Sequence, residues 1–436
     1  MKLNKNHKII LANGALWALF NGLTSAYLIA YALALGASNA IIGLLGAMPY
    51  IATILTQITG ATLVQHFKRK HINVVLGLAS RLWWIAIIAA PYIFTQPIIP
   101  IIIFFLLVNI GTTLTTPAWA SLIADTVPEK HRGEFVGKRY TYIGIFGITA
   151  TTIGGLWLQQ FPKQSPTGFA IMFAFGTIIG IISVIILGKI KEPPYKDHEP
   201  HKLKEFFTLK GELKKYTLFG LIFNFGYMFA SPFFAVYILK NLGVEYEYFG
   251  ILVAISTLAR VISAKTAGKI IDKYGYKKTA MIGVIGTGLI PLVYLIITQQ
   301  TLWLLIPAQI IAGISWAITD IAVFNLLISI ASPEKQAMQI AEYTFYTAIA
   351  LATAPILGGI ISDNIKIILT GIPLVFAISF ILRTGSAILL SKIKEPKAKK
   401  EYTMKYIIVH TLHSIKGIEH SIQMLKKIGI GLGLKR

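Results

Sequence analysis

The chain has 436 residues, of which 55% are hydrophobic and 14% are charged, and its mean hydropathy is +0.67. Because a soluble domain carries about 25% charged residues, this composition excludes an ordinary soluble enzyme, and the absence of cysteine excludes disulfides, a thiolate nucleophile and Cys-ligated metal sites. The net charge of +23 does not indicate nucleic-acid binding, because the basic residues lie in short loops without a zinc-finger or RNA-binding signature.

Twelve apolar segments are long enough to cross a membrane, which takes about 20 residues. They lie near 9–32, 40–64, 72–95, 98–126, 136–160, 167–189, 216–239, 247–268, 279–298, 301–331, 337–361 and 366–391. The first follows three lysines without a convincing cleavage site, which predicts a retained span rather than a signal peptide. The chain is therefore predicted to be an all-α membrane protein with twelve transmembrane helices.

The two halves of the sequence repeat each other. L-G-K-I-K-E-P at 187–193 returns as L-S-K-I-K-E-P at 390–396, and Gly36 and Gly43 return at a common interval as Gly243 and Gly250. A nearly constant interval indicates a duplicated unit. The predicted division is a six-helix bundle over 1–190, a polar linker over 191–215, a second six-helix bundle over 216–391 and a basic amphipathic tail over 392–436.

The basic residues predict the orientation in the membrane. Alternate gaps between the spans hold nearly all of them, and the opposite gaps hold only Lys163, Lys240 and Lys366. The positive-inside rule then predicts that both termini are cytoplasmic, in the cell (plasma) membrane. The tail from residue 401 is predicted to lie as an amphipathic helix on anionic membrane lipid; the alternative is a partly disordered solubilising tail.

One loop carries a family resemblance. Residues 268–278 read G-K-I-I-D-K-Y-G-Y-K-K, which resembles the signature loop of the major facilitator superfamily (MFS), and 354–359 (A-P-I-L-G-G) is similar to an element of MFS exchangers. Gly268 is expected to permit close helix packing, Asp272 to face a helix N-terminus, Gly275 to permit a tight turn, and Lys277 and Lys278 to lie at the anionic inner surface. The first-half copy at 61–71 keeps only its basic end, where Arg69 is the expected partner of Asp125.

The resemblance implies two pseudo-symmetric bundles around a central cavity lined by spans one, four, seven and ten. The polar and aromatic residues of these spans are the candidates for binding substrate or a coupling ion. They are Asn21 and Tyr27 in span one, Asn109 and Trp119 in span four, Asn224 and Tyr227 in span seven, and Trp316, Asp320 and Asn325 in span ten.

Asp320 is expected to be the acid that lies deepest within a span. A charge in the bilayer is unfavourable and so calls for a function or a partner. Asp320 is therefore a hypothetical site for proton coupling or for a cationic substrate group; the alternative is a structural pair with Arg81, Arg260 or Arg383. Arg260 and Arg383 are expected near the inner boundary in structural roles, while the role of Arg81 stays open.

The leading hypothesis is a secondary active transporter that moves a small organic solute by alternating access, with efflux by proton antiport as one form of it. The alternatives are a passive uniporter of a sugar-like solute and a non-transporting receptor or scaffold with the same fold. An enzyme is not expected, because a prenyltransferase would need clustered aspartates. No cofactor and no metal site are expected, since the nine histidines fall in loops or in the tail. The expected partners are the solute, possible coupling protons and membrane lipids, and the resemblance implies a monomer.

Overall fold

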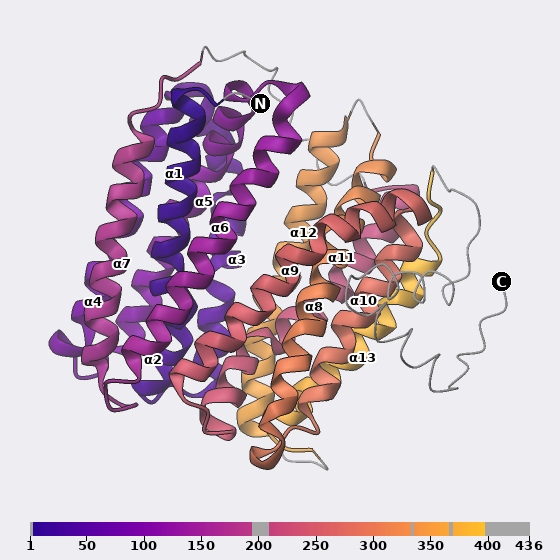
Figure 1. Cartoon of the computed structure of the whole chain (residues 1–436). Helices are drawn as coiled ribbons and strands as arrows, with labels where there is room; N and C mark the ends of the chain where they lie inside the picture. Colours follow the sequence, from indigo (N-terminus) through magenta and orange to yellow (C-terminus); the bar gives the residue numbers. More distant parts are fainter. Residues whose placement is uncertain (1–2, 194–208, 333–334, 366–368, 397–436) are drawn as a thin grey trace, which may run out of the picture.

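The computed structural model describes residues 3–193, 209–332, 335–365 and 369–396. These residues form helices joined by short turns, without a β-strand among them. Figure 1 shows two lobes side by side, one built from the first half of the sequence and the other from the second half. The prediction of an all-α protein made of two helical bundles is confirmed.

Each lobe is built from six apolar segments, some of which are divided into shorter helices. The first lobe contains α1 (Lys5–Leu23), η1 (Ser25–Tyr27), α2 (Leu28–Ala34), α3 (Asn39–His66), α4 (Arg69–Ile93), α5 (Ile98–Thr126), α6 (Glu129–Leu158) and α7 (Pro166–Leu187). The second contains α8 (Gly211–Val236), the π-helical η3 (Tyr237–Asn241), α9 (Tyr246–Tyr274), α10 (Tyr276–Tyr294), η4 (Gln299–Leu304), α11 (Leu305–Ile330), α12 (Gln336–Asn364) and α13 (Ile372–Ser391). Most of the predicted linker and tail lie outside the described residues.

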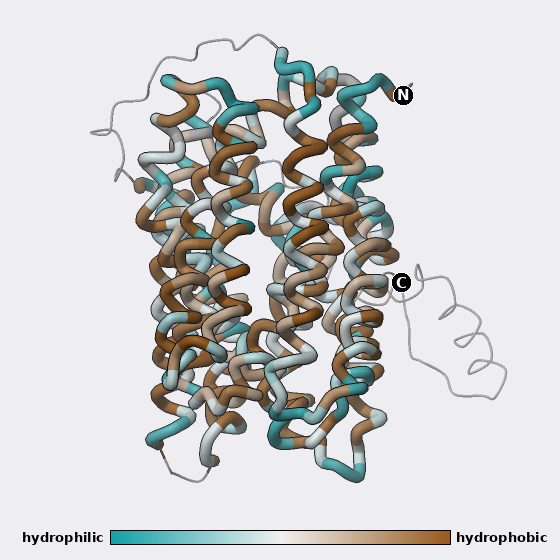
Figure 2. The backbone as a smooth tube through the Cα atoms, turned by 90° about the vertical axis from the view of Figure 1, so that its left-hand side faces the viewer, coloured by the Kyte–Doolittle hydropathy of each residue, from teal (hydrophilic) through white to brown (hydrophobic). Residues whose placement is uncertain are grey.

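Eleven of these segments are long and apolar enough to cross a membrane within the described part of the chain. The twelfth predicted span, 279–298, corresponds to α10, whose first turn carries Lys277 and Lys278 and is therefore less apolar. α10 nevertheless packs along α11 and α13 as a full member of its lobe. In Figure 2, hydrophobic residues fill the middle of the helices and hydrophilic residues gather at both ends, as a bilayer requires.

Hydrogen bonds between neighbouring residues cap the start of α1. At α1, the Asn4 side chain accepts a hydrogen bond from the His7 backbone N–H at 2.9 Å, and His7 Nδ1 accepts one from the Asn4 N–H at 3.2 Å. This reciprocal cap satisfies two N–H groups that would otherwise have no partner. His7 is 3% exposed and packs on Phe135, so it lies in the first turn of α1 and not in a loop as expected.

The two lobes touch mainly where α3 packs against α12 and α6 packs against α9. The glycines of the repeat make these contacts possible. A Cβ atom at Gly43 would overlap the carbonyl of Pro355 in the other lobe, and one at Gly250 would lie 2.8 Å from the Thr151 carbonyl. The other repeated pair, Gly36 (φ +83°) and Gly243 (φ +69°), has left-handed backbone in the turns before α3 and α9.

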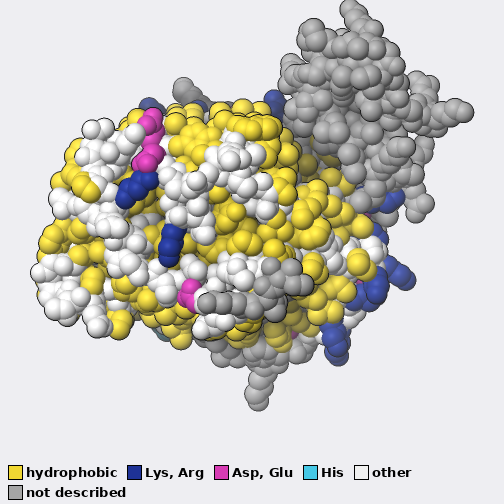
Figure 3. Space-filling view, turned by 90° about the horizontal axis from the view of Figure 1, so that it is seen from below, with side chains coloured by type: hydrophobic (Ala, Val, Ile, Leu, Met, Phe, Trp, Pro, Cys, Tyr) yellow, Lys and Arg dark blue, Asp and Glu magenta, His cyan; other side chains and the backbone are white. Residues whose placement is uncertain are grey.

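We call the end of the bundle that carries these contacts the contact end and the opposite end, where the N-terminus and Arg69 lie, the basic end. At the contact end, Asn39 Nδ2 donates to Ser362 Oγ at 3.0 Å, and the Ala40 N–H donates to Asp363 Oδ2 at 2.8 Å. Figure 3 shows this face, on which charged side chains are few. In Figure 1 the ribbons of the lobes diverge towards the basic end, where Gln57 Nε2 on α3 still donates to the Ala341 carbonyl on α12 at 3.1 Å.

Candidate functional site

A cavity of about 280 Å³ lies between the lobes and draws on five helices. α3 supplies Tyr50 from the first lobe, and α12 supplies Leu351 from the second. The other lining residues are Asn224 and Tyr227 on α8, Arg260 on α9, and Trp316 and Asp320 on α11. Its volume is close to the lower limit of known small-molecule sites, about 300 Å³, which suits a small solute.

The two charged residues of this cavity form an ion pair, in which Arg260 Nη2 contacts Asp320 Oδ2. Both residues lie in the middle of long helices, yet their side chains are 54% and 41% exposed. The exposure follows from the cavity, because the pair lines its wall. Asp320 thus pairs with Arg260, one of the three arginines named above as its alternative structural partners, and Arg260 lies in the middle of α9 rather than near its end.

Aromatic rings form the wall next to the ion pair. The rings of Tyr227 and Trp316 meet edge to face, with centroids 4.6 Å apart. Behind Tyr227, the Arg383 guanidinium lies 5.4 Å from the ring centroid and donates to the carbonyls of Gly226, Tyr227 and Thr287 at 3.0 to 3.3 Å. Arg383 is 1% exposed and bonds the backbone of α8 from inside the second lobe, in line with the structural role expected for it.

Four of the nine predicted candidates, Asp320, Asn224, Tyr227 and Trp316, line this cavity. Tyr27 does not, because span one is interrupted at Thr24 and its next turn faces the contact between the lobes. The Tyr27 hydroxyl donates to the Thr151 carbonyl, and its ring packs against Phe249 of the other lobe. At 1% exposure, Tyr27 belongs to the lobe contact and not to the cavity.

The remaining four candidates also lie outside the cavity lining. Asn109 and Asn325 each donate to the backbone carbonyl four residues earlier, at 2.7 Å. Trp119 lies under the guanidinium of Arg139, 4.4 Å from the ring centroid. Asn21 accepts a bond through its backbone from the Thr24 N–H at the end of α1. These contacts stay within the first lobe or within one helix, as expected for helix-stabilising polar groups.

At the basic end, Arg69 gathers a cluster of acceptors at the start of α4. It contacts Asp125, its expected partner, and donates to Glu192 at 3.2 Å and to Ser121 at 2.9 Å. The Arg69 N–H and the Lys70 N–H also donate to the Glu192 carboxylate, at 3.0 and 3.3 Å. Glu192 belongs to the repeated K-I-K-E-P segment that follows α7. Its carboxylate contacts the basic end of the first-half loop copy, which is the part of the motif that this copy keeps.

The second half repeats this arrangement with Glu395. Its carboxylate accepts from the Tyr276 and Lys277 N–H groups at 2.8 and 3.2 Å, at the start of α10. Gly275 has φ +89°, as the predicted tight turn requires. Lys277 Nζ donates to the carbonyls of Ser391 and Ile393 at 3.0 and 2.9 Å, so this lysine caps carbonyl groups at the C-terminal end of α13.

Other members of the predicted gating loop differ from expectation or lie at the surface. A Cβ at Gly268 would meet nothing within 4 Å, so this glycine does not serve close packing. Asp272 is exposed near the end of α9, and Lys278 is half-buried in the first turn of α10. Glu342, near the start of α12, is 1% exposed, whereas Asp320 lies in the middle of α11.

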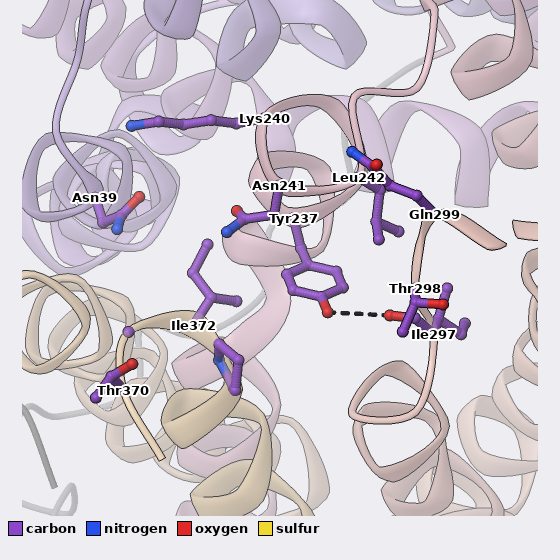
Figure 4. Close-up of a pocket in the computed structure, with 12 residues that line it drawn as sticks. Asn39, Tyr237, Lys240, Asn241, Leu242, Ile297, Thr298, Gln299, Thr370 and Ile372 are labelled. Atoms are coloured by element: carbon purple, nitrogen blue, oxygen red, sulfur yellow. Dashed lines mark hydrogen bonds between the residues drawn. The ribbon is translucent and has the colours of Figure 1, made fainter. Parts of the chain in front are cut away.

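A second, larger cavity of about 550 Å³ lies at the contact end. Figure 4 shows its lining, in which the Lys240 side chain extends towards Asn39 and the Tyr237 hydroxyl bonds the Ile297 carbonyl at 3.2 Å. Loop and helix-end residues form most of it. The smaller cavity contains the Arg260–Asp320 pair, whereas Lys240 is the one charged residue in the described lining of the larger cavity.

Comparison with known proteins agrees with this architecture. The family model of the Major Facilitator Superfamily matches residues 9–234 and 216–413, once for each half. The chain belongs to the Major Facilitator Superfamily. As an MFS protein it is an integral membrane transporter of some solute and not an enzyme. An uncharacterized MFS-type transporter of Methanocaldococcus jannaschii is 24% identical over 384 residues, which cover 84% of this chain and 93% of that protein.

Solved MFS structures share the fold at low identity. The crystal structure of a D-xylose-proton symporter superimposes with a TM-score of 0.72 at 16% identity, covering 91% of this chain and 99% of that one. The xylose transporter XylE from E. coli in an inward open conformation gives 0.70 at 14% identity, covering 93% and 98%. The crystal structure of the nucleoside transporter NupG gives 0.66 at 14% identity, covering 90% and 100%. These likenesses establish the fold alone.

Proposed function

We propose that this MFS protein is a secondary active transporter that carries a small organic solute by alternating access and couples its movement to protons through Asp320. The observation that carries the proposal is the Arg260–Asp320 pair, which lines a cavity between two lobes that pack through α3 and α12 and through α6 and α9. A carboxylate in such a cavity can bind and release a proton as access changes. The cavity provides the solute site and the pair provides the coupling site.

The proposal also assigns the two ends of the molecule. The excess of Lys and Arg in alternate gaps supports a cytoplasmic location for the basic end and for both termini. The lobe contacts then close the outer side, and the solute enters or leaves from the cytoplasm in this conformation. We propose a monomer, because the Major Facilitator Superfamily membership implies one.

The test is transport in proteoliposomes, after a thermal-stabilisation screen of small metabolites and drugs has identified a bound solute. We expect accumulation of that solute against its gradient when a pH gradient is imposed, and collapse of the accumulation with an uncoupler. Accumulation should disappear in Asp320→Asn while solute exchange persists, and Glu134→Gln, an exposed acid at the basic end, should behave like the wild type.

Each other outcome identifies a different function. Facilitated movement without accumulation would indicate a passive uniporter and overturn the coupling. A bound solute that never crosses the membrane would indicate a receptor or scaffold. If Asp320→Asn keeps pH-driven accumulation, Asp320 is not the coupling residue.

A further inference from the structure

The cavity is lined by few charged side chains. Among its lining residues, Arg260 and Asp320 are the charged groups, and Tyr50 and Tyr227 are the other titratable ones. α10 meets the same stretch of α11 through Gly283 and Gly286, so it brings no charge to Asp320. α8 adds Asn224 and α12 adds Leu351. In the described cavity lining, Arg260 is thus the one cationic group that faces Asp320.

We infer that the solute is an organic anion, a carboxylate on a small ring-containing body, that binds Arg260 while Asp320 carries a proton. This inference rests on the proposed function and names its substrate class. The solute carboxylate takes the place of the Asp320 carboxylate on the guanidinium, and the proton goes to the displaced Asp320. Anion and proton therefore cross the membrane together.

The two side chains differ in whether a proton can neutralise them, and this difference favours an anionic solute over a cationic one. Asp320 can be neutralised by a proton, whereas an arginine side chain keeps its charge in proteins. An anion that displaces Asp320 leaves a group that a proton can neutralise. A cation that displaces Arg260 leaves a guanidinium that nothing in the described cavity lining neutralises. The suggestion of a cationic substrate rested on an acid without a partner, and the Arg260 contact removes that basis.

The net charge of the cavity in each loading state also explains why the movement of the anion is coupled to that of the proton. The empty carrier has the intact ion pair, and the fully loaded carrier has the Arg260–anion pair with a neutral Asp320, so both forms are neutral. A carrier with only the proton or only the anion holds one uncompensated charge in a closing, poorly solvated cavity. Such half-loaded forms should reorient slower by roughly two orders of magnitude or more. Proton and anion then move in the same direction, as symport, in place of efflux by antiport.

The remaining lining residues suit the rest of such a solute. A guanidinium binds a carboxylate through two parallel N–H bonds, which fixes the plane of the anion. Tyr227, Trp316 and Tyr50 then offer aromatic surface to a ring, and the cavity of about 280 Å³ admits only a small body. In the first lobe, Arg139 contacts Trp119, and no carboxylate of the described chain pairs with it; this cation adds to a field that favours anions.

The test uses four probes that share one ring and differ in charge: phenylacetate, phenylacetamide, phenethylamine and phenylalanine. Binding to the purified full chain is measured by calorimetry at about pH 6 and about pH 8. We expect phenylacetate to bind and the other three to bind at least tenfold more weakly. Because one proton accompanies the anion, its affinity should fall by up to about a hundredfold between the two pH values.

Variants separate the two roles. Arg260→Gln should lose phenylacetate binding, and Asp320→Asn should keep it without the pH dependence. The double variant Arg260→Gln/Asp320→Asn leaves no uncompensated charge and should fold without binding the anion. Lys240→Gln removes an exposed cation that lies outside this cavity and should match the wild type.

Binding of the amine or the amide at least as tight as that of phenylacetate, no binding of any probe, or equal phenylacetate affinity in wild type and Arg260→Gln would overturn the anion assignment. Those results leave the transport proposal standing. The transport proposal fails separately, when no solute of the wider screen is exchanged in proteoliposomes.

Discussion

Arg260 and Arg383 lie in apolar helices of the same lobe, and their surroundings give them different tasks. Arg383 is 1% exposed and its guanidinium donates to three backbone carbonyls, whereas Arg260 reaches a carboxylate in a cavity. In the sequence both are single basic residues within spans. Only the packing of α8, α10 and α13 around Arg383 distinguishes it, and no pattern along α13 reports that packing.

Replacement of Arg383 by leucine should destabilise the protein, because three carbonyls lose a charged donor. The expected loss is about 2–4 kcal/mol, seen as a lower melting temperature in detergent. Solute affinity should also fall, since Arg383 supports the backbone of Tyr227. Lys240→Leu at the exposed contact end is the matched control, and an equal effect of both changes would contradict the role assigned to Arg383.

At the scale of the element, glycine decides how closely α3 and α12 approach. Ala at a helical glycine normally stabilises by about 0.5–1 kcal/mol. At Gly43 we expect the opposite, because the new methyl group overlaps the Pro355 carbonyl. Gly43→Ala should therefore lower the melting temperature, whereas Gly137→Ala, which meets nothing within 4 Å, should raise it slightly. Similar gains in melting temperature in both variants would show that α3 and α12 can move apart at Gly43 without a loss of stability.

The two carboxylates of the repeat begin two equivalent helices. Glu395→Ala removes the acceptor for two N–H groups of α10 and should cost about 1–2 kcal/mol. Glu192→Ala should cost more, about 2–4 kcal/mol, because the buried Arg69 also loses a carboxylate partner. Thermal unfolding measures both, with the exposed Glu134→Ala as the reference. Equal losses would mean that Glu192 acts only as a helix cap.

The repeat also shows how far the sequence predicts this fold. The twice-written K-I-K-E-P and the paired glycines predict duplicated bundles, because identical residues at a nearly constant interval occupy equivalent places. The function of Glu192 and Glu395 was not predicted, since the N–H groups that they cap lie 123 and 119 positions away along the chain. Long-range contacts of this kind depend on how helices fold back on one another.

At the scale of the whole molecule, the angle between the lobes determines which residues form the site. Spans one, four, seven and ten were expected to line the cavity, and α8 and α11 confirm two of them. Tyr50, Arg260 and Leu351 come instead from α3, α9 and α12, whose faces approach because the lobes close at the contact end. A hydropathy pattern gives the spans but carries no information about this approach, so these three residues were missed.

The contact end should have to open for transport, and the chain is well suited to a test because it contains no cysteine. Asn39 and Ser362 face each other across the lobes, with Nδ2 and Oγ 3.0 Å apart, so Asn39→Cys/Ser362→Cys places two thiols within reach of a short thiol cross-linker. Alternating access requires the lobes to part here. Cross-linking should therefore reduce transport to background, with recovery after reduction, while solute binding persists from the basic end. Each single-cysteine variant controls for labelling alone. Continued transport by the fully cross-linked protein would show that this end stays closed throughout the cycle.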